Sequence, residues 1–195
     1  AIDDATGMIV GAWFDKQETL SGYYHVFRQI LTCYGIPYMF YTDRRTVFEY
    51  KQKNSPSLEN DTFTQFGYAC KQLGVDLKTS IPQAKGRIER LFGTLQSRLP
   101  AELRLAGIST IEQANEFLAS YLKEFNARFA LDMDCIKSVF EKQPDEEKID
   151  QFLAVITPRK VDAGHCIRFQ NKYYELRDEQ GMRSDFHKGT SVMVI

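Results

Sequence analysis

Residues 36–43 form a short apolar stretch, hydrophobic on both faces, that ends in the carboxylate of Asp43. A strand of this kind fits inside a sheet covered by helices on both sides. The residues before it predict a helix, because apolar side chains recur there at helical spacing after a capping Thr19 or Ser21, and Gly35 follows as a terminator. A helix followed by a buried strand favours an α/β fold.

The rest of the chain continues this alternation and then changes character. Up to Leu131 we predict a hairpin over residues 2–14, a polar loop over 44–60, a helix from Asp61 through Leu73, a strand over 75–80, a helix over 84–105, and a helix from Ser109 or Thr110 to Phe125. After Leu131 we predict an acidic helix over 134–150, a β-hairpin over 161–176 and a strand over 189–195. The first part is therefore mixed and the last part is all-β.

Charge and composition exclude several classes of protein. The net charge of −1 argues against a uniformly basic nucleic-acid binder, but residues 78–104 carry six basic and two acidic side chains, whereas residues 132–150 carry three basic and seven acidic ones. A local basic stripe of this kind is a candidate phosphate-binding surface. The four cysteines have no CxxC spacing and the three histidines have no metal-ligand spacing, so we expect reduced thiols in a cytosolic protein. We find no apolar run long enough for a membrane span.

Two carboxylates distant in sequence are candidates for a metal site. Asp43 closes the buried strand, and Glu89 lies on the helix predicted over 84–105, with Gly86 and Gly93 on the same helical face. The glycines leave room beside the carboxylate for a metal ion, a phosphate or another backbone, and Lys85 is placed to contact such a phosphate. Two structural alternatives stay open: Lys85 and Glu89 can form an ordinary surface ion pair, and Asp43 can be a turn aspartate.

Four segments resemble a known family. In order and rough spacing, these segments resemble the integrase-core transposases of bacterial insertion sequences; they are residues 2–7, 41–44, 85–95 and 125–130. Such transposases are relatives of retroviral integrase with an RNase H-like fold. Residues 159–195 resemble the small β-barrel that follows the core in such transposases. The resemblance implies an α/β RNase H-like core, a mixed sheet flanked by helices, followed by a small all-β, barrel-like domain.

The resemblance also implies an acidic triad, Asp-Asp-Glu, in which Asp43 matches the second aspartate and Glu89 the glutamate. The first aspartate is expected on a strand that precedes residue 2, outside this chain, because Asp3 and Asp4 match a different position of the family. Catalytic use of the triad implies Mg²⁺ or Mn²⁺, with two ions when DNA is bound. The candidate DNA-binding residues are Lys85, Arg87, Arg90, Arg44 and Arg45, although Arg87 or Arg90 can equally pair with the acidic segment 132–150.

The expected organisation has three parts. Residues 1–131 form the RNase H-like catalytic core without its first strand, residues 132–158 form an acidic helical linker, and residues 159–195 form a small, truncated β-barrel domain. We therefore expect a fragment of a longer transposase that is inactive alone.

The leading functional hypothesis is a polynucleotidyl transferase that cleaves and joins DNA in its full-length form. The implied partners are transposon ends, target DNA and further copies of the protein on that DNA, with no membrane, in the bacterial cytoplasm at the nucleoid. Two alternatives stay open: a non-catalytic module for DNA binding or assembly, and an RNase H-type nuclease. The loop over residues 44–60, which carries several basic side chains, and the β-barrel fit the nuclease less well.

Overall fold

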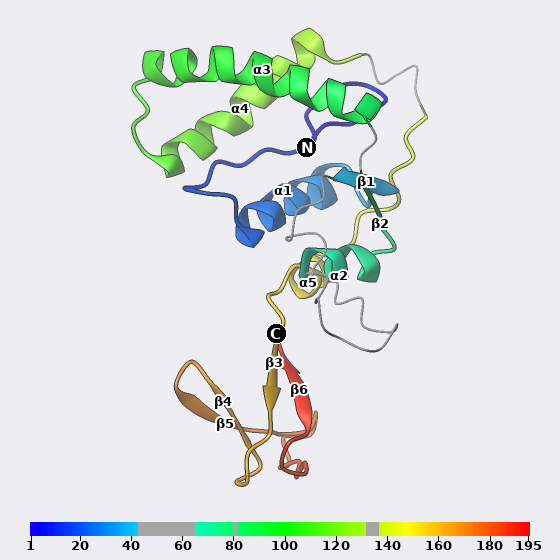
Figure 1. Cartoon of the computed structure of the whole chain (residues 1–195), viewed down its shortest axis with the longest axis vertical. Helices are drawn as coiled ribbons and strands as arrows, with labels where there is room; N and C mark the ends of the chain where they lie inside the picture. Colours follow the sequence, from blue (N-terminus) through cyan, green and yellow to red (C-terminus); the bar gives the residue numbers. More distant parts are fainter. Residues whose placement is uncertain (43–64, 80–81, 132–136) are drawn as a thin grey trace. The chain divides into compact units, whose positions relative to one another are not determined.

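The structure is a computed structural model that describes residues 1–42, 65–79, 82–131 and 137–195. The chain divides into two compact units, Ala1–Leu153 and Ala154–Ile195. Figure 1 labels the helices and strands of both units. In the described part of the chain, no helix is both long enough and apolar enough to span a bilayer.

The long helices of the first unit begin and end close to where the sequence predicts. They are α1 (Leu20–Cys33), α2 (Gln65–Gln72), α3 (Pro82–Leu105) and α4 (Ile111–Phe129). The side chain of Thr19 caps α1 by accepting a hydrogen bond from the Gly22 N–H at 3.0 Å, and Thr110 caps α4 by accepting one from Gln113 N–H at 3.3 Å. The predicted cap of α2, Asp61, lies outside the described residues.

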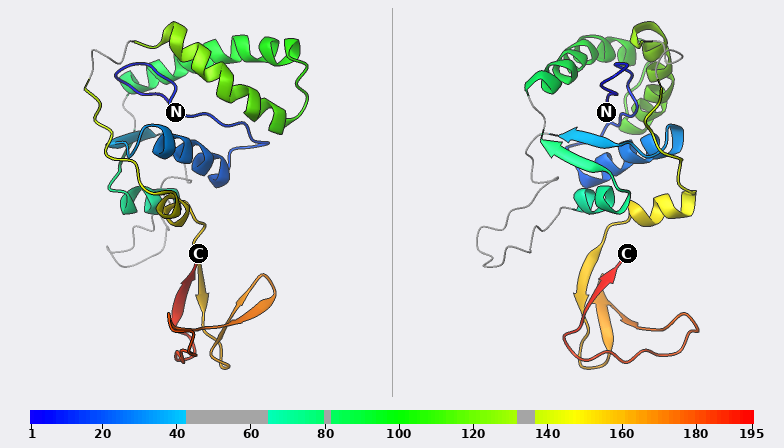
Figure 2. Two further views of the ribbon diagram at one scale, coloured as in Figure 1. Left: turned by 180° about the vertical axis from the view of Figure 1, so that it is seen from behind. Right: turned by 90° about the vertical axis from the view of Figure 1, so that its right-hand side faces the viewer.

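Two strands of the first unit form a parallel pair. Strand β1 (Met39–Thr42) pairs with β2 (Asp76–Thr79), and Phe40 lies opposite Leu77. Both strands fall inside the ranges predicted from the sequence, 36–43 and 75–80, although β1 is shorter. Figure 2 shows the pair beside α1, with α3 and α4 lying side by side and running in opposite directions. The wider mixed sheet of an RNase H-like core stays a prediction.

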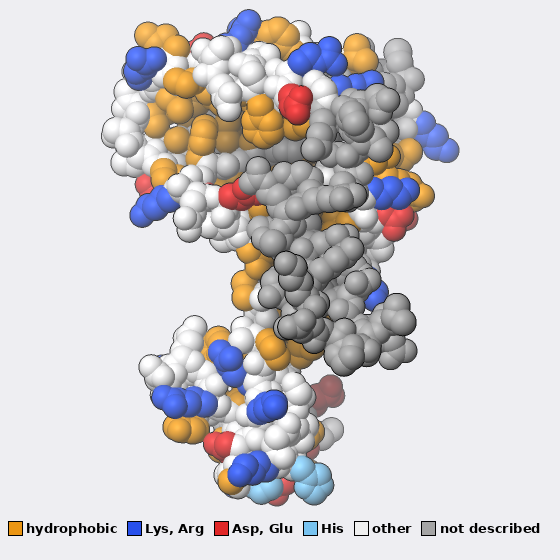
Figure 3. Space-filling view, in the orientation of Figure 1, with side chains coloured by type: hydrophobic (Ala, Val, Ile, Leu, Met, Phe, Trp, Pro, Cys, Tyr) orange, Lys and Arg blue, Asp and Glu red, His pale blue; other side chains and the backbone are white. Residues whose placement is uncertain are grey.

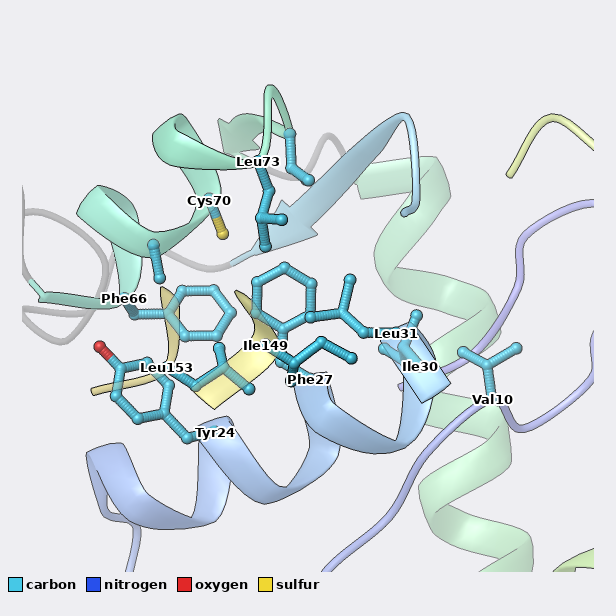
Figure 4. Packing of buried hydrophobic residues seen from close by; sticks show 12 residues of the cluster. Val10, Tyr24, Phe27, Ile30, Leu31, Phe66, Cys70, Leu73, Ile149 and Leu153 are labelled. Carbon is cyan, nitrogen blue, oxygen red and sulfur yellow. The ribbon is translucent and has the colours of Figure 1, made fainter. Parts of the chain in front are cut away.

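Helix α1 supplies the centre of the hydrophobic core of the first unit. Phe27, Ile30 and Leu31 are fully buried there. The ring of Phe27 lies 5.6 Å from the ring of Phe66 on α2, measured between centroids. Ile149 of α5 (Glu146–Phe152) packs against both helices, as Figure 4 shows. Helices α1, α2 and α5 therefore share one core, with β1 and β2 at its edge.

Helix α3 is much less buried than the sequence predicts. Five apolar residues recur at helical spacing along α3; Leu99 is buried and the other four are partly exposed: Ile88, Leu91, Leu95 and Leu103. The N-terminal half of α3 therefore has a weaker hydrophobic anchor than α1.

The predicted hairpin over residues 2–14 is present only as a turn and one antiparallel bridge, between Ile2 and Ile9. Further along, the side-chain amides of three helical residues pair with the backbone of Ile9, Ala12 and Phe14, while the N–H of Val10 donates to the carbonyl of Ala1 at 3.1 Å. Asn126 accepts from Ile9 N–H at 2.8 Å and donates to Ile9 C=O at 2.9 Å. Gln29 pairs in the same way with Ala12, and Asn115 with Phe14. These amides satisfy backbone groups that a neighbouring strand would otherwise satisfy, so no regular strand forms.

The acidic helix predicted over 134–150 is wrong for residues 137–145, and residues 134–136 lie outside the described part of the chain. Among residues 137–145 none is helical, and Glu141 forms an antiparallel bridge with Ile36. Pro144 disfavours a helix before it, so α5 begins only at Glu146. Gly35 permits the bridge, because its φ of +105° suits glycine and a Cβ at this position would collide with the carbonyl oxygen of Glu141. The first compact unit runs from Ala1 to Leu153, and the functional division into a core over 1–131 and a linker over 132–158 stays a prediction.

The second unit consists of two antiparallel strand pairs. Strand β3 (Thr157–Lys160) pairs with β6 (Ser191–Val194), and β4 (Cys166–Phe169) pairs with β5 (Lys172–Glu175). Gln170 and Asn171, with φ of 47° and 61°, form the two-residue turn of the β4–β5 hairpin. The hairpin over 161–176 and the strand over 189–195 are therefore confirmed, and the closed barrel stays a prediction.

We expect Asn126→Ala to destabilise the protein by about 2 kcal/mol, because it leaves the buried N–H and C=O of Ile9 without their partner. Asn115→Ala is the matched control and should cost less, since its partner Phe14 is only half-buried. Denaturant unfolding measures both. Equal losses for the two variants would contradict a special role for the Ile9 pairing.

Burial raises the pKa of the Cys70 thiol to about 12, whereas Cys33 is exposed. Because the thiolate is the reactive form, we expect iodoacetamide at pH 8 to alkylate Cys33 at least about tenfold faster than Cys70. Mass spectrometry of peptides from the folded protein measures both rates. Labelling of Cys70 as fast as Cys33 would show that α2 opens readily.

Candidate active site

A cavity of about 700 Å³ opens in the first unit where three elements meet. Its wall comes from residues 1–4, from residues 37–42 including all of β1, and from the N-terminal half of α3. A second cavity of about 380 Å³ shares Ile88 and Phe92 of α3 with the first. Figure 3 shows hydrophobic side chains open to solvent in this region of the first unit, below α3. The wall therefore combines apolar surface with a few acidic groups.

Glu89 lies in the wall of the larger cavity, as one of its acidic groups. Its side chain is exposed and makes no hydrogen bond or ion pair with another residue that the structure describes. At Gly86 and Gly93, which share its helical face, an added Cβ would meet no described atom within 4 Å. The carboxylate is thus accessible, with open space on either side of it along the helix.

The carboxyl end of β1 contributes to the same cavity. Thr42 is part of the cavity wall, and Asp43 is the next residue in the sequence. Asp43 itself lies outside the described residues, as do Arg44 and Arg45. The structure thus brings the strand that leads to Asp43 and the helix that carries Glu89 to one cavity.

Asp3 and Asp4 also lie in the wall, but their carboxylates have partners. Asp3 accepts hydrogen bonds from the N–H of Thr6 at 2.9 Å and from its hydroxyl at 2.5 Å, which closes the turn over residues 3–7. The carboxylate of Asp4 lies 3.3 Å from the guanidinium of Arg87, which also donates to the Asp4 carbonyl. Both aspartates are thus engaged in structural contacts.

The basic candidates on α3 differ in their surroundings. Arg87 contacts Asp4 and makes no ion pair with residues 137–150, the described part of the acidic segment. Arg90 donates from Nε to the carbonyl of Gly86 within its own helix, at 3.0 Å, and is exposed. The side chain of Lys85 lies outside what the structure describes. Of the two arginines, Arg90 has the more accessible charge.

The donor set at this cavity fits a hard divalent cation, because carboxylate oxygens are its preferred protein ligands. Among the residues that the structure describes, no three His, Cys, Asp or Glu side chains come together as a metal site. Glu89 is one accessible ligand, and Asp43, after Thr42, is the candidate for a second. Metal binding therefore stays a prediction that depends on residues beyond those described.

Sequence reasoning missed the contact between Asp4 and Arg87. The two residues are 83 positions apart, and no local periodicity connects them. It also missed the aromatic character of the site, since Tyr41 and Phe92 both lie in the cavity wall and are about half exposed, at 49% and 55%. Their helix and strand positions were predictable, but their meeting at one cavity depends on the tertiary fold.

Comparison with known proteins identifies two relatives. The chain is 54% identical over 196 residues to the transposase for insertion sequence IS1202 of Streptococcus pneumoniae, an alignment that covers 100% of this chain and 42% of the relative. It is 37% identical over 131 residues to a protein of Sinorhizobium fredii with a provisional transposase name, y4bF, covering 67% of this chain and 28% of that protein.

The chain thus spans less than half the length of the curated relatives that it matches. No family model matches the sequence. Identity of this level over the whole chain nevertheless establishes common descent: the chain is a homologue of part of a bacterial insertion-sequence transposase.

Proposed function

We propose that this chain is the catalytic region of a transposase that cuts and joins DNA strands, with Asp43 and Glu89 as metal ligands. One observation carries the proposal: Glu89 and Thr42, the neighbour of Asp43, belong to the wall of the same cavity. A carboxylate at a strand end and one on a helix of the same cavity could bind a shared metal ion. The transposase names of the two relatives support the same reaction class.

In this proposal the protein positions reactants and provides negative charge for cation binding. Glu89 and Asp43 would hold Mg²⁺ or Mn²⁺, with two ions when DNA is present. Such ions, when bound, would neutralise charge on the reacting phosphate. The exposed Arg90, together with Lys85, Arg44 and Arg45, would contact the DNA backbone on either side of that phosphate. Cleavage would free a 3′-hydroxyl at the transposon end, and this hydroxyl would then attack a phosphodiester of the target DNA.

The third carboxylate of the triad is proposed to come from a strand that precedes residue 2 in the full-length protein. Asp3 and Asp4 are engaged in the turn and with Arg87, so neither is free to serve. In the described part of the chain, β1 pairs with β2 along one edge only. The cavity adjoins β1 and residues 1–4, and an extended segment placed there would pair with backbone groups and cover apolar side chains. The chain alone would then be inactive.

The second candidate function is a non-catalytic module for DNA binding or for assembly of several copies on DNA. The observation that favours it is that no group of three metal ligands comes together among the described residues. Two carboxylates hold a divalent cation more weakly than three, because each lost ligand removes charge from the cluster. Under this alternative, DNA binding would be independent of metal and of Glu89.

We expect Glu89→Gln in the full-length protein to lower magnesium-dependent cleavage and strand transfer by about a thousandfold or more, the effect of losing several kcal/mol of charge stabilisation. The melting temperature should stay the same or rise, because the substitution would relieve like-charge repulsion within the proposed carboxylate cluster in the absence of metal. Glu102→Gln, exposed on the same helix, is the matched control and should leave the rate unchanged. Asp43→Asn should act like Glu89→Gln.

Gel assays of transposon-end DNA with the wild type and both glutamate variants measure the effect. Full strand transfer by Glu89→Gln would refute the catalytic proposal. Unchanged DNA binding without any metal-dependent reaction in the wild type would favour the non-catalytic module. A loss of several kcal/mol in stability for Glu89→Gln would instead indicate a structural ion pair.

The strand proposal makes a separate prediction for the 195-residue chain. Extending it at its N-terminus by the residues that precede it in the full-length protein should slow hydrogen exchange of the amides of β1 by about tenfold or more, since a new neighbour protects them. An extension of the same length with prolines at alternate positions is the control, because proline cannot donate to a strand ladder. Equal exchange in both extended forms would place the segment elsewhere.

A further inference from the structure

The contact between Arg87 and Asp4 joins two parts of the first unit that are distant in sequence. A single guanidinium contacts both the carboxylate of Asp4, at 3.3 Å, and the carbonyl oxygen of the same residue. Arg87 lies in the second turn of α3, two residues before Glu89. The contact therefore connects the helix that carries the candidate catalytic glutamate to the N-terminal segment.

The N-terminal segment is a firm anchor for this contact. Asp3 closes the turn over residues 3–7 through two hydrogen bonds to Thr6, and Thr6 is buried, with 3% of its surface exposed. The carbonyl of Thr6 accepts from the N–H of Leu131, just after α4, at 2.9 Å. Asp4 is thus held within a turn that is itself tied to the rest of the unit.

Helix α3, in contrast, has few other contacts with described residues along its N-terminal half. Ile88 and Leu91 are only partly buried, and the first fully buried side chain beyond them is Leu99. Within the part of the chain that the structure describes, Arg87 makes the polar contact that ties this half of α3 to another element. The orientation of the turn that carries Glu89 is consequently fixed by this polar contact together with the partial packing of Ile88 and Leu91.

Arg90 provides the contrast on the same helix. Its guanidinium donates to the carbonyl of Gly86, one turn earlier, and makes no ion pair with a described residue. The charge of Arg90 is therefore available to an external phosphate, whereas the charge of Arg87 is neutralised by Asp4. Arg87 and Arg90 thus differ in their partners: Arg87 is paired with another element, and Arg90 is bonded only within its own helix among the described residues.

We propose that Arg87 is a positioning residue that acts through Asp4: it fixes the first turns of α3, and with them Glu89, against the turn over residues 3–7. This inference rests on the proposed function of Glu89. It assigns Arg87 to the interior arrangement of the site rather than to DNA contact. Both side chains are about half exposed, so the pair adds little to global stability; its effect is on the geometry of the site, where small displacements strongly reduce rates.

The first test needs no DNA and no activity. In the 195-residue chain, Arg87→Ala should speed hydrogen exchange of the amides of residues 87–92 about two- to fivefold, because the local opening of α3 becomes easier. Arg90→Ala, with the same change in side chain and helix propensity, should leave these amides within error of the wild type. Equal effects of the two variants would overturn the proposal.

The second test uses the full-length protein on transposon-end DNA. Arg87→Ala should lower kcat about tenfold while leaving KM within about twofold, since the site is misplaced but the DNA surface is intact. Arg90→Ala should weaken DNA binding and reduce the salt slope of that binding by about one. The exchanged pair Asp4→Arg with Arg87→Asp should recover at least about half of the lost rate, because it restores the attraction between turn and helix.

Two results would overturn the proposal. One is that Arg87→Ala weakens DNA binding and lowers the salt slope while the exchanged pair gives no recovery, which is the behaviour of a phosphate contact. The other is that Asp4→Asn and Arg87→Lys both leave kcat and exchange unchanged, which is the behaviour of an idle surface pair. If Glu89→Gln is fully active, the proposed function fails, and the exchange test alone then decides whether Arg87 fixes the helix.

Discussion

The first unit depends on the packing of one face of α1. Phe27, Ile30 and Leu31 are fully buried, and they contact a single hydrophobic cluster that includes α2, α5 and residues near β1. An ion pair between Arg28 and Asp150 adds a polar contact between α1 and α5. Burial of such side chains contributes about 1.5–3 kcal/mol each, so the packing of this face contributes strongly to the stability of the first unit. Strand β1, which leads to Asp43, lies at the edge of this cluster, and Phe40 of this strand packs against it.

Much of this architecture was predictable, because local signals and tertiary packing agree. The cap at Thr19, the terminator at Gly35 and the strand over 36–43 follow from spacing and from the chemistry of single residues, and the structure has α1 and β1 in these places. The failures have the opposite cause. Residues 137–145 were expected to be helical from their acidic composition, yet Glu141 pairs with Ile36. The two residues are far apart in the sequence, so no local pattern could predict this contact.

The candidate site divides in the same way. Glu89, Gly86 and Gly93 could be recognised from helical spacing alone, and the structure has the carboxylate at a cavity with open space around it. The sequence could not reveal which charged side chains are already paired within the protein, because such pairs join residues that are far apart in the sequence. Arg87 was a candidate for DNA contact by sequence, whereas the structure pairs it with Asp4. Only after such pairs are known can the remaining free charges be assigned to an external partner.

The amide side chains that pair with the chain between Ile9 and Phe14 have a consequence for solubility. A backbone segment with unpaired N–H and C=O groups is a template to which a strand of another molecule can add, which leads to aggregation. Asn126, Gln29 and Asn115 already occupy these groups at Ile9, Ala12 and Phe14. The helices thus satisfy the backbone groups of this apolar segment with their own side chains, so a strand of another molecule cannot pair with those groups.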